Sequence, residues 1–384
     1  MIYTFGSIVL LYAFGCLWLS WQWWLIPKRP ASNLTIPADF KLTLIVPVRN
    51  EAVHIGALLR DLEQQTLPKN HFEVIIANDA STDNTVAIVK ALEEEMVLDL
   101  QLLNLPDEQV GSPKKRAITQ AIKVAKGGLI VTTDGDCRVS AKWLETIVQT
   151  YLQTGVKMIS GPVTFLEAPT LPLSFRGGIF AVFQTIEFAS LIGAGGCLIE
   201  AGYPTMCNGA NLAYERGAFE EVGGYEGVDQ IASGDDEFLL QKISQRFPKV
   251  ICFLKNQDAI VSTQSQPNWK AFYQQRVRWA SKWAVDRRVA TMVVAIFVFL
   301  VNFITLFLWE ELLRSKAEDT LLLVILLLKL VPEFIFLTLI VQYLGKSKWL
   351  IYIPLVQFVY PLYVLFFGIA AQRKGYEWKG RKLK

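Results

Sequence analysis

The sequence has few residues of the kinds that build disulfide frameworks or zinc sites. Its five cysteines show no C-x-x-C spacing, and its two histidines have no ligand partner nearby in the sequence. The net charge is only +3, and the basic residues form no long stripe beside aromatic side chains. These absences argue against a disulfide framework, a structural zinc site and a nucleic-acid partner.

Charge is absent from residues 2–26, which are rich in Leu, Trp, Tyr and Phe. Such a stretch is long enough to cross a hydrocarbon core of about 30 Å. A signal peptide is the alternative, but a basic start and a small-residue cleavage site are missing. We therefore expect a transmembrane helix within residues 1–27. Lys28 and Arg29 follow it, so the positive-inside rule predicts an integral protein of the inner or plasma membrane whose next segment is cytoplasmic.

Residues 30–288 have the composition of a soluble α/β domain. Short runs rich in β-branched residues, each too short for a helix, predict parallel central strands. Intervening apolar residues at helical spacing predict crossover helices of βαβ units. The expected strands are residues 42–48, 72–78 and 129–133, and the expected helices lie in residues 51–65 and 83–96.

Residues 289–371 contain about three further apolar stretches, which we expect to be transmembrane segments. Lys329 and Glu333 lie inside the middle one at helical spacing and should pair with each other or face protein or water. Three crossings leave the basic tail, residues 372–384, outside, whereas its charge favours the cytoplasm. Residues 171–198 fit either an amphipathic helix at the membrane interface or an ordinary buried helix.

Polar residues follow two of the predicted strands directly. One strand ends in Pro47, Arg49 and Glu51, and the next in Asn78, Asp79 and the turn residues up to Asp83. Ligands bind outside the carboxyl ends of parallel strands, so these two ends predict a nucleotide cradle. Ser81 and Asp83 also fit simple capping of the following helix.

A third strand delivers Asp134, Gly135 and Asp136. The charge of a nucleotide-sugar diphosphate is offset by a hard divalent cation bound to carboxylates, so we expect Asp136 to be a metal ligand. Asp134 would contact the ribose or a metal-bound water, and Gly135 would allow close backbone approach. A plain turn is the alternative, because D-G is common in turns.

Three consecutive acids, Asp235, Asp236 and Glu237, open a probable helix farther along the chain. Such a cluster is costly unless a cation or a bound hydroxyl uses it. Sugar transfer with inversion needs one carboxylate to accept the proton of the attacking hydroxyl, and we expect Asp236 to be that base. Stabilisation of a helix N-terminus is the alternative, above all for Glu237.

Gln275, Arg278 and Trp279 fall on one face of a predicted helix just before the second membrane segment. A guanidinium fixed there can bind a departing diphosphate, while an indole can stack on a sugar ring. A membrane-proximal anchor is the alternative, since Arg and Trp are frequent there.

The order of P-x-R-N-E, N-D-A-S-T-D, D-G-D, N-G-A-N, G-D-D-E and Q-x-x-R-W over residues 41–288 resembles glycosyltransferase family 2. The resemblance implies a GT-A fold, which is Rossmann-like with a mostly parallel sheet, a UDP-sugar donor and Mg²⁺ or Mn²⁺. It further implies specific site residues: nucleoside contacts at Pro47, Arg49, Glu51 and Asp79, a donor contact near Lys114, diphosphate and metal contacts at Asp134 and Asp136, a base at Asp236, and a closing motif at Gln275, Arg278 and Trp279. Asp235 stands where many relatives have Glu, which leaves open whether Asp235 or Asp236 takes the proton.

The leading hypothesis is transfer of a sugar to a lipid or glycan acceptor at the membrane. A processive polysaccharide synthase, similar to cellulose, chitin or hyaluronan synthases, is the alternative, although four crossings are few for a polymer channel. A transporter or a non-catalytic membrane protein is a distant alternative, because here the acids cluster at soluble strand ends rather than at mid-membrane.

Overall fold

The computed structural model describes residues 2–29, 34–108, 111–167, 178–280, 288–315, 319–370, 376–378 and 381–383. The chain divides into two compact units. The first comprises residues 1–25, 168–194 and 266–377, and the second comprises residues 26–167, 195–265 and 378–384.

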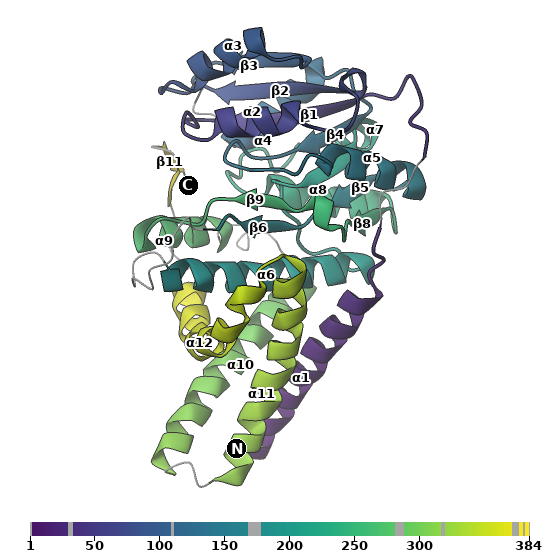
Figure 1. The fold of residues 1–384 in the computed structure, drawn as a ribbon. Helices are drawn as coiled ribbons and strands as arrows, with labels where there is room; N and C mark the ends of the chain where they lie inside the picture. The colour runs from purple at the N-terminus through teal and green to yellow at the C-terminus, as the bar shows by residue number, and fades with distance from the viewer. Residues whose placement is uncertain are drawn as a thin grey trace. The chain divides into compact units, whose positions relative to one another are not determined.

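The second unit is built on a mostly parallel sheet (Figure 1). In the described residues the strand order is β3-β2-β1-β4-β7-β5-β8, and β7 alone runs antiparallel to its neighbours. The strands are β1 (Leu42–Val48), β2 (Phe72–Asp79), β3 (Leu100–Leu105), β4 (Leu129–Thr132), β5 (Met158–Ser160), β7 (Leu212–Glu215) and β8 (Ile251–Phe253), with β6 (Val163–Phe165) and β9 (Val261–Thr263) as a separate parallel pair. The three strands expected from sequence are confirmed.

Helices cover this sheet because its central strands are apolar along their whole length, as strands buried on both faces must be. One face packs against α4 (Pro113–Val124) and α8 (Asp235–Arg246), which share a core with Ile45, Ile75 and Ile130. The other helices of this unit are α2 (Ile55–Glu63), α3 (Thr85–Glu95), α5 (Trp143–Thr154) and α7 (Arg216–Glu221), with 3₁₀ turns η1 (Lys69–His71) and η2 (Gln257–Ala259). The two expected crossover helices correspond to α2 and α3.

The first unit is helical. It contains α1 (Ile2–Leu25), α9 (Trp269–Ala280), α10 (Val289–Arg314), α11 (Thr320–Tyr343), the 3₁₀ segment η4 (Ser347–Tyr352), α12 (Ile353–Ala370) and most of α6 (Gly178–Glu200). Helices α1 and α11 lie side by side (Figure 1). The described residues include five helices long and apolar enough to cross a membrane: α1, α6, α10, α11 and η4 with α12. Of these, α6 is mostly buried within the protein, as expected for a core helix.

A polar cluster joins three of the apolar helices. Lys329 and Glu333, one turn apart on α11, form an ion pair of 2.7 Å. Tyr12 on α1 donates to Glu333 at 2.9 Å, and Gln357 on α12 donates to the same carboxylate at 2.8 Å. The ionisable pair therefore faces protein, as a charged pair within an apolar helix requires. The short strands β10 (Tyr376–Trp378) and β11 (Arg381–Leu383) pair in the tail, most of which lies outside the described residues.

Candidate active site

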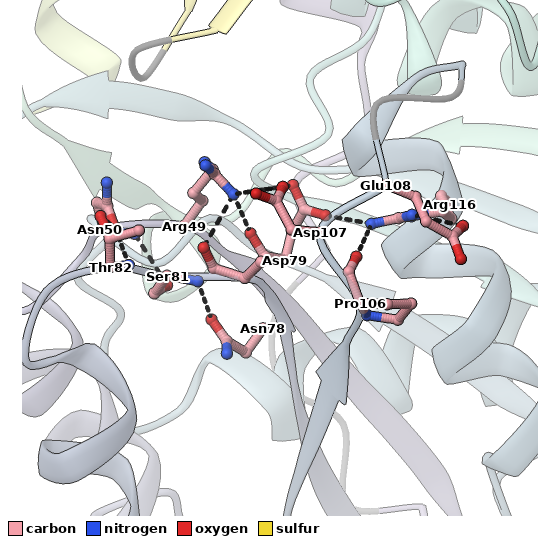
Figure 2. A network of polar contacts seen from close by, with 11 residues as sticks. Arg49, Asn50, Asn78, Asp79, Ser81, Thr82, Pro106, Asp107, Glu108 and Arg116 are labelled. Carbon is pink, nitrogen blue, oxygen red and sulfur yellow. Dashed lines mark hydrogen bonds and ion pairs between the residues drawn. The ribbon is translucent and has the colours of Figure 1, made fainter.

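The carboxyl ends of β1 and β2 are tied together by Arg49. Its guanidinium donates to the backbone oxygens of Asp79, at 2.6 Å, and Ala80, at 2.9 Å (Figure 2). Arg116, from α4, donates to the Asp79 carboxylate at 2.6 Å. Both Arg49 and Asp79 are buried. The two strands run in register with Pro47 beside Ala77, so Pro47, Arg49, Glu51 and Asp79 gather at one edge of the sheet.

The turn residues after these strands mainly accept hydrogen bonds from backbone N–H groups. Ser81 accepts from the Asn50 N–H at 3.0 Å, and Asn50 accepts in return from the Thr82 N–H at 2.8 Å (Figure 2). Asp83 accepts from the N–H groups of Ala52 and Thr85, each at 3.0 Å. Asp83 thus bonds the first N–H of α3, as the capping interpretation predicts, whereas Ser81 bonds the loop after β1 and not the helix.

The D-G-D loop lies against the end of β1. A side-chain carbon at Gly135 would come within 2.9 Å of Val48 and 3.0 Å of Glu51. Only glycine therefore fits at this close approach, which places the loop beside the expected nucleoside site. Asp136, the second acid of the loop, accepts from Thr263 on β9 at 3.2 Å.

Lys114 connects this loop to the acids of α8. Its ammonium lies 2.7 Å from Asp134 and 3.2 Å from Asp235. The carboxylate of Asp236 accepts from the backbone N–H of Gly209 at 3.0 Å, and a side-chain carbon at Gly209 would lie 2.9 Å from Asp235. Lys114 and residues from three separate motifs, D-G-D, N-G-A-N and G-D-D-E, thus meet in one cluster.

The cluster perturbs the acid–base properties of its members. Burial by itself lowers the pKa of Lys114, but the charges of Asp134, Asp235 and Asp236 outweigh it, and the net shift is upward. Burial also raises the pKa of Asp235; Lys114 opposes this rise, whereas Asp236 and Asp134 reinforce it. The ammonium therefore stays protonated and screens the repulsion among the three carboxylates.

The donor atoms at the D-G-D loop suit Mg²⁺ or Mn²⁺ shared with a substrate. Asp134 and Asp136 offer hard carboxylate oxygens, but no group of three or more potential protein ligands gathers in the part of the chain that the structure describes, this loop included. Mg²⁺ in nucleotide sites typically uses one or two carboxylates and completes its shell with phosphate oxygens and water. The loop fits such a shared cation better than a cation held by protein alone.

The three residues of the Q-x-x-R-W motif lie on α9, in the other unit. Gln275 accepts from Arg276 at 2.7 Å, and the Arg276 guanidinium covers the Trp279 ring at 4.2 Å from its centroid. Arg276 also pairs with Glu187 on α6, and Tyr363 on α12 donates to that carboxylate at 2.8 Å. Gln275 and Trp279 are therefore held by a buried polar network, and Arg278 is half-buried on the same helix.

The sequence-based prediction did not include Arg116 or Lys115. With Lys114 they form three consecutive cations in the first turn of α4. Cations are unfavourable at the positive end of a helix dipole, so three in a row there require nearby acceptors. That pattern was the signal that could have identified them.

Comparison with known proteins agrees with this geometry. Residues 129–371 match the model of glycosyl transferase family group 2, and residues 43–190 match that of glycosyl transferase family 2. The chain belongs to glycosyltransferase family 2. Together the matched regions span residues 43–371 and contain every motif described above.

Proteins similar to this family 2 chain include two glycosyltransferases and a solved structure. Glycosyltransferase AglE from Haloferax volcanii is 35% identical over 32% of this chain and 40% of its own length. Probable glycosyltransferase YdaM from Bacillus subtilis is 24% identical over 66% of this chain and 57% of its own length. The chain thus spans less than two thirds of either relative.

The solved structure is the mannosyltransferase PcManGT from Pyrobaculum calidifontis, in complex with GDP-Man and Mn²⁺. It is 18% identical, covers 92% of this chain and 98% of its own, and superposes with a TM-score of 0.57. This likeness, together with the mostly parallel sheet, confirms the predicted GT-A fold.

Proposed function

We propose that this protein is a membrane-embedded, inverting glycosyltransferase that moves a sugar from a UDP-sugar to a lipid or glycolipid acceptor. The convergence of Asp134, Lys114, Asp235 and Asp236 carries this proposal. These groups come from the D-G-D loop, the start of α4 and the start of α8, and together they offer both a diphosphate site and a candidate base.

The proposed donor site runs along the carboxyl edge of the sheet. Pro47, Arg49, Glu51 and Asp79 would contact the nucleoside, since Arg49 and Arg116 already fix the end of β2. Asp134 and Asp136 would hold Mg²⁺ or Mn²⁺, which supplies positive charge against the diphosphate when bound. Lys114, which lies against Asp134, can add its own charge to the same phosphates.

The proposed transfer proceeds in one displacement. The acceptor hydroxyl oxygen forms a bond to the anomeric carbon while the bond from that carbon to the diphosphate oxygen breaks on the opposite face. Asp236 takes the hydroxyl proton, and the leaving group departs as UDP. Asp236 suits this role better than Asp235, because Asp235 is already paired with Lys114 whereas Asp236 is oriented by the N–H groups of Gly209 and Glu237.

Two further features extend the proposal. Arg278 of the closing motif would bind the departing diphosphate, with Gln275 and Trp279 as further donor-binding residues. The candidate membrane helices favour an acceptor presented at the bilayer, with the catalytic unit on the cytoplasmic side that Lys28 and Arg29 indicate. The Q-x-x-R-W motif also supports a processive polysaccharide synthase as the second candidate.

The test uses the purified full-length chain with panels of UDP- and GDP-sugars, Mg²⁺ or Mn²⁺ and a membrane lipid extract. We expect divalent-cation-dependent release of UDP and a product one or a few sugars heavier than a lipid, detected by mass spectrometry. Long polymer formed from the donor alone would favour the synthase. No nucleotide release from any donor would refute transferase activity.

Point variants test the roles. Asp136→Asn should weaken metal-dependent donor binding, whereas Asp236→Asn should keep donor binding and lower transfer by about 100-fold or more. Asp39→Asn, an exposed acid just before β1, is the matched control and should behave as wild type. Normal turnover by Asp236→Asn together with inactive Asp235→Asn would move the base assignment to Asp235.

A further inference from the structure

The segment that precedes the two acids of α8 is held by a single buried lysine. The Lys115 ammonium donates to the carbonyl oxygens of Val228, at 2.8 Å, Ile231, at 2.8 Å, and Ser233, at 3.0 Å. The side chain is only 1% exposed. Each of its three N–H donors can therefore be matched to a carbonyl of residues 228–233, which we call the acid-delivery loop.

The start of α4 clamps the same loop through its backbone. The Ser112 N–H donates to the oxygen of Asp229 at 2.7 Å. Gly111 has φ of +68°, and a side-chain carbon there would lie 2.8 Å from that same oxygen. Four of the six carbonyl groups in the loop thus accept hydrogen bonds from α4 or its N-cap. Residue 111 must be glycine for the Asp229 carbonyl to come this close to the chain before α4.

The neighbouring residue of α4 contacts the reacting groups themselves. Successive residues on a helix point about 100° apart, so Lys114 reaches Asp134 and Asp235 while Lys115 reaches the loop. Directly after Ser233, Gly234 turns with φ of +78° and α8 begins at Asp235. A displacement of the loop is therefore transmitted within two residues to Asp235 and Asp236.

We propose that Lys115 is a positioning residue that sets the place of Asp235 and Asp236 relative to the donor. This inference rests on the proposed function and deepens it. A lysine suits the role because a compact ammonium satisfies several carbonyl oxygens at once. Burying such a charge is costly unless it is hydrogen-bonded, so its three bonds strongly favour one loop conformation.

The experiment compares two lysines with the same chemistry at different distances from the acids. Lys242 on α8 donates to the oxygens of Val222, Gly224 and Glu226, at 3.4, 2.8 and 2.7 Å, all of which precede the acid-delivery loop. Lys115→Met and Lys242→Met each remove one such ammonium while keeping an unbranched side chain. Steady-state rates with the preferred UDP-sugar, thermal unfolding and amide hydrogen exchange are measured for both.

For Lys115→Met we expect kcat to fall about 10- to 100-fold, the effect of a misplacement near 1 Å, with the donor KM within about threefold of wild type because the donor contacts lie elsewhere. Amide exchange over residues 228–236 should become faster. Lys242→Met should lower thermal stability but keep kcat within about threefold, since its bonds do not touch the acid-delivery loop.

A folded Lys115→Met variant with unchanged kcat, or with unchanged exchange over residues 228–236, would overturn the proposal. Should this variant fail to fold, Gly111→Ala presses on Asp229 from the same side and must lower kcat in its place; unchanged kcat there also overturns it. Hydrogen exchange does not depend on turnover. A wild-type protein without transferase activity would therefore refute the proposed function, whereas the exchange rates over residues 228–236 would still test whether Lys115 holds the loop.

Discussion

Replacing Gly209 by Ala should test whether the charged cluster must keep its present geometry. The new methyl group would lie 2.9 Å from Asp235 Oδ2, 3.3 Å from Lys114 Nζ and 3.5 Å from Asp236 Cβ. Ordinary van der Waals contact begins near 3.4 Å, so the Asp235 carboxylate must move by about 0.5 Å, half the displacement expected to cost 100-fold.

The size of the effect follows from what that movement breaks. The ion pair between Lys114 and Asp235 is 3.2 Å long, close to the limit of a hydrogen bond, so a small shift disrupts it. A displacement of half an ångström should cost about 1.4 kcal/mol in the barrier, or about tenfold in kcat. The fold should tolerate the change, because the Asp235 side chain is 13% exposed and has room to move.

The assay is the initial rate of UDP release by Gly209→Ala at saturating donor and acceptor, with thermal unfolding measured alongside. Gly217→Ala is the matched control, because Gly217 lies in helix α7 with nothing within 4 Å of the added carbon. It should stabilise the fold by about 0.5–1 kcal/mol and leave kcat unchanged. Wild-type kcat for Gly209→Ala would refute the claim that this cluster is the reaction centre.

Three further outcomes can be checked by unfolding. Asn211→Ala should destabilise the catalytic unit by about 3–6 kcal/mol. Its buried amide makes three hydrogen bonds of 2.7 to 3.0 Å, and the substitution would leave their partners unsatisfied. Circular dichroism in urea measures the free energy of unfolding, and a loss below about 1 kcal/mol would contradict the prediction. The hydrogen bond from Lys41 is the largest cause of the lowered pKa of Asp99. That stabilisation is present above the ordinary Asp pKa of about 3.9 and is lost as the pH falls through the lower folded value, so Asp99→Asn should lower the melting temperature slightly at pH 7 and by less at pH 3; equal losses at both would refute it. Lys329→Met should destabilise the detergent-solubilised protein by about 3–5 kcal/mol, because it leaves Glu333 buried without its ion-pair partner. The double variant Lys329→Met/Glu333→Leu should recover much of that loss. A double variant no more stable than the single one would argue against a purely structural pair.

Local patterns were sufficient to predict the framework of this protein. The strand over residues 42–48 and its neighbours were identifiable because strands buried on both faces must be apolar throughout. The strands β5 and β8 were not predicted, because they have three residues each, too few to show a period. The long apolar helices were evident from composition, yet the burial of α6 within the protein depends on partners distant in sequence.

The chemical groups of the site could likewise be identified from the sequence, but their contacts with one another could not. By itself the sequence determined which acids follow strands, since in a parallel sheet those ends share one edge. Only the tertiary structure decided that Lys114 would bridge Asp134 and Asp235 and that Lys115 would face carbonyl groups more than a hundred residues away. Ion pairs and hydrogen bonds act over a few ångströms, so their pairing is settled by how the chain folds back on itself and leaves no local pattern.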